Sequence, residues 1–192
     1  GKSYFGKMLG YLLSNQMVNG TPARDRFIPR LAGVKDEQFL INEIGKLDAH
    51  PSHLVLFDAA KHKNSNGLAF ALFQKFLESL GFSDDPYGYF EFQLFETGEF
   101  DEFKKRVRKL ELEEWDILKT QKSEVPRYLR KTLIGWKYSE KEYEETLNYL
   151  RYQFLNMDTA KLREELTHYL KLFPDKTIVF IFDEASEAIA QK

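Results

Sequence analysis

Two short apolar runs, each followed directly by aspartate, limit what this chain can fold into more than any other feature. Residues 54–57 (LVLF) precede Asp58, and residues 177–182 (TIVFIF) precede Asp183 and Glu184. Runs of this length that are apolar or β-branched throughout are typical of strands buried on both faces, as in parallel sheets. Parallel strands need a long crossover connection between them. We therefore expect an α/β fold.

The sequence between these two strands is mostly of helical pattern. Apolar side chains recur at a spacing of three to four residues over 36–47, over 67–80 and through most of 84–172. Ser139 and Glu142 form a capping-box pattern, which predicts that a helix starts after Ser139. Asp158 is the expected N-cap of the next helix. Helices therefore dominate the connection.

The chain begins with Gly1, Lys2 and Ser3, followed by helical spacing over residues 4–14. These three residues match the second half of the phosphate-binding pattern G-x-x-x-x-G-K-[ST], which lies at a strand-to-helix turn. In that pattern Lys contacts the β- and γ-phosphates and Ser binds Mg²⁺. The first half of the pattern is absent, and the chain also ends abruptly. We therefore expect a fragment of a longer protein, inactive by itself.

The second apolar run and its acidic end match a Walker B strand. Asp183 would hold Mg²⁺ through its water shell, and Glu184 would polarise the attacking water as a general base. The alternative is a core strand that ends in an acidic helix start. Asp58 ends the first run, where it could contact substrate, water or a sensor group, or simply cap the following turn.

Together these patterns predict an incomplete P-loop NTPase of AAA+-like type, with a parallel sheet and a large, mostly helical insertion. Its cofactors would be ATP and Mg²⁺. Residues 1–82 would form the N-terminal part of the core, 83–172 the helical insertion, and 173–192 the Walker B strand and the start of the following helix. The predicted roles are catalysis by Glu184 and Lys2, nucleotide binding by Gly1, Lys2 and Ser3, and metal binding by Ser3 and Asp183.

The wide separation of the two motifs is similar to that in one family of large ATPases. The chain resembles the BrxC/PglY-like P-loop proteins of bacterial BREX phage-defence systems. The resemblance is carried by residues 1–5 (GKSYF), 53–59 (HLVLFDA), 80–82 (LGF), 99–104 (EFDEFK), 157–159 (MDT) and 178–184 (IVFIFDE). Residues 185–189 (ASEAI) depart from the glycine-containing stretch of the family, which leaves the subfamily unassigned.

The resemblance implies an ATPase in a multi-protein complex that modifies host DNA and blocks phage. Its partners would then be other subunits of that complex, with DNA contacted indirectly. Two other functions stay open on the residues alone. One is a nucleotide-gated scaffold or signalling module that binds ATP with little turnover. The other is a helical interaction domain in which both motifs are accidental.

Composition excludes several other classes of site. The chain has no cysteine, which removes disulfides, thiolate zinc sites and cysteine nucleophiles. The net charge of -2 gives the whole chain no electrostatic footprint for nucleic acid. The sequence shows no membrane span and no signal peptide, so a cytoplasmic location is expected.

His50 and His53 lack carboxylates at ligand spacing, which predicts no metal site there, and His168 is expected at a surface or boundary position.

Overall fold

The computed structural model describes residues 2–58 and 66–183, and it is a mixed α/β structure in which helices predominate. Packing divides the chain into two compact units, Gly1–Lys63 with Tyr169–Lys192, and Asn64–His168. The elements of the first unit are α1 (Lys2–Ser14), β1 (Met17–Val18), β2 (Thr21–Pro22), α2 (Ala23–Phe27), η1 (Ile28–Leu31), α3 (Glu37–Lys46), η2 (Leu47–Ala49), β3 (Ser52–Asp58) and β4 (Thr177–Asp183).

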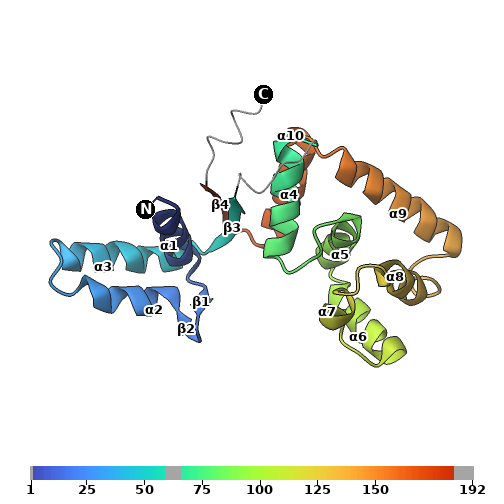
Figure 1. Ribbon diagram of the computed structural model, residues 1–192, viewed down its shortest axis with the longest axis horizontal. Helices are drawn as coiled ribbons and strands as arrows, with labels where there is room; N and C mark the ends of the chain where they lie inside the picture. Colours follow the sequence, from blue (N-terminus) through green and yellow to red (C-terminus); the bar gives the residue numbers. More distant parts are fainter. Residues whose placement is uncertain (1, 59–65, 184–192) are drawn as a thin grey trace. The chain divides into compact units, whose positions relative to one another are not determined.

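The second unit is helical. Its elements are α4 (Leu68–Ser79), α5 (Pro86–Glu96), α6 (Phe100–Glu111), α7 (Trp115–Leu118), α8 (Val125–Leu133), α9 (Glu140–Leu155) and α10 (Thr159–Leu172), whose last residues from Tyr169 onward belong to the first unit (Figure 1). Among the described helices, none is both long and apolar enough to cross a bilayer. The domain boundaries expected after residues 82 and 172 stay predictions.

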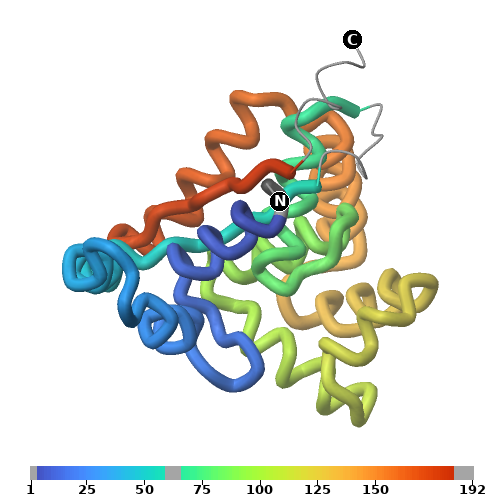
Figure 2. The backbone as a smooth tube through the Cα atoms, turned by 60° about the vertical axis from the view of Figure 1, so that its left-hand side comes forward, coloured from blue at the N-terminus to red at the C-terminus, as the bar shows by residue number. Residues whose placement is uncertain are grey.

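Strands β3 and β4 pair in parallel, as the two apolar runs predicted. The register runs from Ser52 opposite Thr177 to Asp58 opposite Asp183, and Figure 2 shows the two segments side by side. On β3, Val55 and Phe57 are buried, but most side chains of β4 are only partly covered. Burial of β4 on both faces was therefore a wrong expectation. Among the described residues the sheet is this strand pair alone, so each strand has a strand neighbour on one edge only.

Helix α1 packs against one face of this strand pair through two glycines. A Cβ on Gly6 would lie 3.3 Å from Ile181 Cγ2, and a Cβ on Gly10 would lie 2.8 Å from Ile181 Cδ1 and from Leu54 Cδ1. Leu54 pairs with Val179, so it lies nearer the start of the strands than Ile181 does. Successive turns of α1 thus approach the beginning of the strands. The helix runs antiparallel to them and starts at their carboxyl edge.

The other end of α1 is held by a buried arginine. Arg24 is 4% exposed, and its guanidinium donates to the carbonyls of Leu12 at 2.8 Å and Leu13 at 3.0 Å. It also forms an ion pair with Asp48. The last carbonyls of a helix have no partner within the helix, and a cation is stabilised by the negative end of the helix dipole. Arg24 therefore fixes the C-terminal end of α1.

Aromatic side chains fill the core of the helical unit. Phe73 is fully buried, and its ring lies 5.0 Å from that of Tyr89 in an edge-to-face arrangement. Glu91 is also fully buried, where burial raises the pKa of its carboxyl. Its two oxygens accept from the Ser83 N–H at 2.8 Å and from Trp115 Nε1 at 2.5 Å. These bonds satisfy a buried carboxyl group that would otherwise be costly.

Local signals in the helical unit are confirmed in detail. Ser139 accepts from the Glu142 N–H, and the Glu142 side chain accepts from the Ser139 N–H, which completes the predicted capping box before α9. The Asp158 side chain accepts from the Lys161 N–H at 2.8 Å at the start of α10. Both caps satisfy helix N–H groups that have no intrahelical acceptor.

Candidate functional site

Asp58 and Asp183 lie next to each other at the carboxyl edge of the parallel strand pair. They are register partners, and each is the last residue of its strand. Both are partly exposed rather than fully buried. In open α/β sheets, ligands bind outside the carboxyl ends of the strands, since the following loops and helix starts gather there. The structure therefore places two acidic side chains where such folds bind their ligands.

The first turn of α1 lies at the same edge of the strand pair. Lys2 and Ser3 belong to this turn, and the turn contains no acidic residue. The N-terminus of a helix carries unpaired N–H groups and the positive end of the helix dipole, a combination that attracts anions such as phosphate. An anion bound there would lie at the edge that also carries Asp58 and Asp183.

The remaining predicted site residues fall outside the structure. Gly1 and Glu184 lie outside the described ranges 2–58 and 66–183. The other predicted residues are described. The start of α1, with Lys2 and Ser3, lies at the same edge as the end of β4, with Asp183, although the two are far apart in the sequence. The roles assigned to Gly1 and Glu184 stay predictions from the sequence.

A groove of about 420 Å³ lies along α1 and faces α2 and η1. It combines aromatic rings, from Tyr4 and Tyr11, with the cationic side chains of Lys7, Arg26 and Arg30. Arg26 donates to the Val18 carbonyl at 2.8 Å, whereas Lys7 and Arg30 form no ion pair with any described residue. Uncompensated positive charge beside aromatic faces suits an anionic ligand that carries a planar ring.

The groove residues were not identified from the sequence. Residues 23–30 (ARDRFIPR) contain Arg24, Arg26 and Arg30, with Asp25 between the first two, and this segment contains no known binding motif. Arg24 proves to be a buried structural residue, while Arg30 is exposed. The density of arginine in a short segment beside the predicted phosphate-binding helix was the one available signal. Sequence alone does not tell which of these arginines face solvent.

No family model matches the chain, and no solved structure is significantly similar to it.

Proposed function

We propose that the chain is part of a P-loop ATPase that binds Mg²⁺-ATP and hydrolyses it to ADP and phosphate. The supporting observation is the meeting of the first turn of α1 with the ends of β3 and β4 at one edge of a parallel strand pair. The Gly-Lys-Ser sequence at the helix start and the Asp-Glu sequence after the apolar strand are two separate patterns, and neither one implies the other. The approach of α1's first turn to the end of β4 supports the proposal, because nucleotide hydrolysis uses groups of both kinds at one site.

Four side chains have roles in the proposed reaction: Lys2 and Glu184 act on the phosphates and the water, and Ser3 and Asp183 hold Mg²⁺. Lys2 would neutralise charge on the β- and γ-phosphates, and Glu184 would orient a water molecule for in-line attack on the γ-phosphorus. The attacking water forms the new P–O bond as the bond to the β-phosphate oxygen breaks, so ADP leaves with the electron pair. Positioning and charge stabilisation supply most of the catalysis in this class of reaction.

The donor set at the strand edge fits Mg²⁺. Mg²⁺ prefers hard oxygen ligands, keeps several of its waters and is bound by one or two protein oxygens together with phosphates. Asp183 at the end of β4 would supply a carboxylate, and Ser3 in the first turn of α1 would supply a hydroxyl. A bound Mg²⁺ would neutralise phosphate charge during transfer.

ATP hydrolysis by the parent protein, measured in parallel with ATP binding, tests the proposal. Glu184→Gln should retain ATP binding and lose turnover, because an amide cannot accept the proton of the attacking water. Lys2→Ala should lose ATP binding itself. Unchanged ATP affinity in Lys2→Ala would sink the proposal. If wild type and Glu184→Gln both bind ATP and neither hydrolyses it, the protein is instead a nucleotide-gated scaffold.

We propose further that this ATPase acts in a bacterial phage-defence complex, with other subunits of that complex as its partners. The support is the family resemblance alone. Efficiency of phage plating on cells that carry the complete system tests it, comparing the wild-type protein with Lys2→Ala. Equal plating on cells with either protein would refute a role for nucleotide binding in defence.

A further inference from the structure

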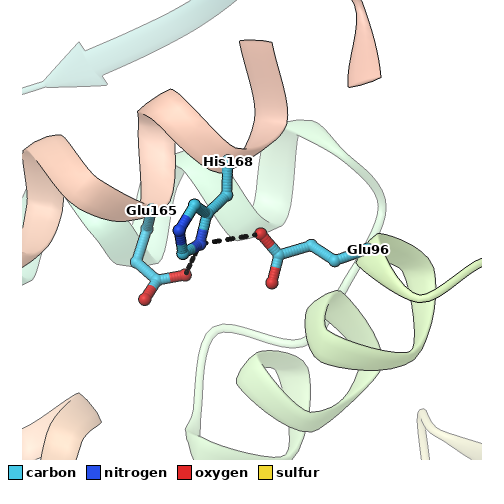
Figure 3. Close-up of side chains that lie close together, drawn as sticks. All are labelled: Glu96, Glu165 and His168. Atoms are coloured by element: carbon cyan, nitrogen blue, oxygen red, sulfur yellow. Dashed lines mark ion pairs between the residues drawn. The ribbon is translucent and has the colours of Figure 1, made fainter. Parts of the chain in front are cut away.

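Two carboxylates and an imidazole converge between α5 and α10 of the helical unit. Glu165 and His168 are three residues apart on α10, which places both on one face of that helix, and Glu96 is the last residue of α5. Figure 3 shows the three side chains pointing toward one another. One potential ligand atom from each lies within 4.8 Å of the other two. None of these residues belongs to the proposed ATP site.

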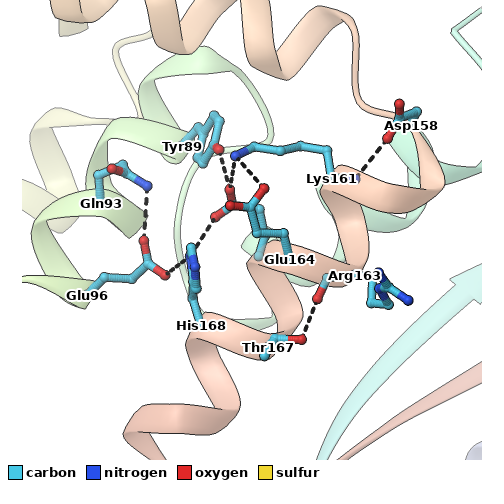
Figure 4. A network of polar contacts seen from close by, with 10 residues as sticks. Tyr89, Gln93, Glu96, Asp158, Lys161, Arg163, Glu164, Thr167 and His168 are labelled. Carbon is cyan, nitrogen blue, oxygen red and sulfur yellow. Dashed lines mark hydrogen bonds and ion pairs between the residues drawn. The ribbon is translucent and has the colours of Figure 1, made fainter.

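Each carboxylate has one oxygen held by a neighbour and one oxygen turned to this meeting point. Glu165 Oε1 accepts from the Tyr89 hydroxyl at 2.6 Å and pairs with Lys161 Nζ at 2.9 Å (Figure 4). Glu96 Oε2 accepts from Gln93 Nε2 at 2.9 Å. The other oxygens, Glu165 Oε2 and Glu96 Oε1, are buried and accept no hydrogen bond. Both lie near His168 Nδ1.

The local charge balance favours a further cation at this point. Glu165 is 1% exposed, and an ionised carboxylate oxygen without a partner is costly in such a place. Burial, and next the charge of Glu165, raise the pKa of Glu96 to about 7. Lys161 pairs with the outer oxygen of Glu165, Oε1, and also with Glu164. The inner oxygens therefore face His168 without a fixed positive charge.

We propose that Glu96, Glu165 and His168 form a binding site for a divalent transition-metal ion of the zinc type. One imidazole nitrogen and two carboxylate oxygens are a donor set that zinc accepts, with three protein ligands and an open fourth position. Bonds of about 2.0–2.1 Å in a tetrahedral site place ligand atoms about 3.4 Å apart. His168 Nδ1 already lies 3.3 Å from Glu96 Oε1 and 3.9 Å from Glu165 Oε2.

The hydrogen bonds and the ion pair to the outer carboxylate oxygens would form an outer shell around the metal ligands. Tyr89, Lys161 and Gln93 hold the outer oxygens of the two carboxylates, so the inner oxygens keep their direction. Hydrogen bonds of this kind orient metal ligands and are required for full metal affinity. The His168 side chain is 37% exposed, which gives an ion access from solvent. The site would thus be held by buried partners and open on the histidine side.

Zn²⁺ binding to the full chain, measured by calorimetry after treatment with chelator, tests the proposal. Wild type should bind one Zn²⁺ per chain, and His168→Gln should weaken that affinity by at least about tenfold, as should Glu96→Gln. His50→Gln changes an exposed histidine elsewhere and should bind as wild type does. Substitution with Co²⁺ should give visible absorption bands that His168→Gln lacks. Circular dichroism of each variant checks that the helices are intact.

Two outcomes would overturn the site. One is weak Zn²⁺ binding with no defined stoichiometry. The other is a His168→Gln variant that binds as tightly as wild type. Either would make the cluster a set of polar contacts among Glu96, Glu165 and His168 with no metal role.

Discussion

Asp58 and Asp183 are register partners at the carboxyl ends of two parallel strands that are far apart in the sequence. Their positions are equivalent in the sheet, but the residues around them differ. Asp183 is the member of the pair that belongs to an Asp-Glu sequence, whereas Asp58 precedes Ala59. The ATPase proposal therefore assigns the Mg²⁺ role to Asp183 and makes the two aspartates distinguishable by experiment.

Replacing Asp183 by Asn should lower ATP hydrolysis by the parent protein by about 10- to 100-fold, because an amide binds the Mg²⁺ shell more weakly than a carboxylate does. Raising the Mg²⁺ concentration should restore part of the rate. Asp58→Asn is the matched control, with the same change at the paired position, and should show the smaller loss. A wild-type rate in Asp183→Asn would contradict the assignment of Mg²⁺ to this residue.

The parts of the fold that depend on neighbouring residues could be predicted from the sequence. The capping box at Ser139, the cap at Asp158 and the two strands each rest on a pattern that spans only a few residues. Such patterns act locally, since the cap residue bonds the N–H groups two or three positions ahead. The parallel pairing of β3 with β4 also followed, because both runs were apolar and their connection was long and helical.

The groups that depend on distant contacts could not be predicted. His168 was expected at a surface or boundary, and its half-exposed side chain agrees with that, but its approach to Glu96 depends on how α5 packs on α10. Burial of Arg24 depends on where α1 ends against the following segment. In both cases the residue type allowed a surface position, and tertiary packing decided. The partial exposure of the β4 side chains likewise depends on which elements pack against that strand.

Gly88→Ala should destabilise the helical unit by about 1–3 kcal/mol or more, because of overpacking. A Cβ at this position would lie 1.7 Å from the Ser83 carbonyl oxygen, so the backbone itself must move. Both tryptophans of the chain, Trp115 and Trp136, lie in this unit. Urea unfolding followed by tryptophan fluorescence therefore reports the loss directly.

Gly45→Ala is the matched control for that change, since Gly45 also lies within a helix and a Cβ there would meet nothing within 4 Å. Alanine should raise the free energy of unfolding of the first unit by up to about 1 kcal/mol, through its better helix propensity. Circular dichroism is the suitable probe. Equal effects of the two substitutions would show that the close approach of Ser83 to Gly88 is not rigid.

Arg24→Met should lower the free energy of unfolding of the first unit by about 2 kcal/mol, because it removes the donors to the Leu12 and Leu13 carbonyls while keeping much of the side-chain volume. Asp48 is exposed and can be hydrated, so its loss of a partner should add little. Arg30→Met, at an exposed position, should stay within about 0.5 kcal/mol of wild type. Chemical denaturation followed by circular dichroism measures both, and a similar small effect of the two would mean that water replaces the Arg24 bonds.

His53 should make the first unit less stable in mild acid. Burial, and next the Lys176 ammonium, lower the pKa of His53 from 6.5 to about 4. Between these two values the unfolded chain binds a proton that the folded chain does not, so stability is lost as pH falls from 6.5 toward 4. Because the imidazole is partly exposed, we expect a loss of about 1–2 kcal/mol rather than the full effect of the shift.

The His53→Gln variant isolates this contribution, because the other titrating groups are common to both proteins. Its free energy of unfolding should be lower than that of wild type at pH 7, where it loses the ring contact with Tyr169 at 5.3 Å. The difference should narrow by about 1–2 kcal/mol at pH 4.5, because the variant has no imidazole to protonate. His50→Gln, which changes an exposed histidine, controls for the chemistry of the substitution. A constant difference between wild type and His53→Gln across this pH range would show that His53 protonates equally in the folded and unfolded chains.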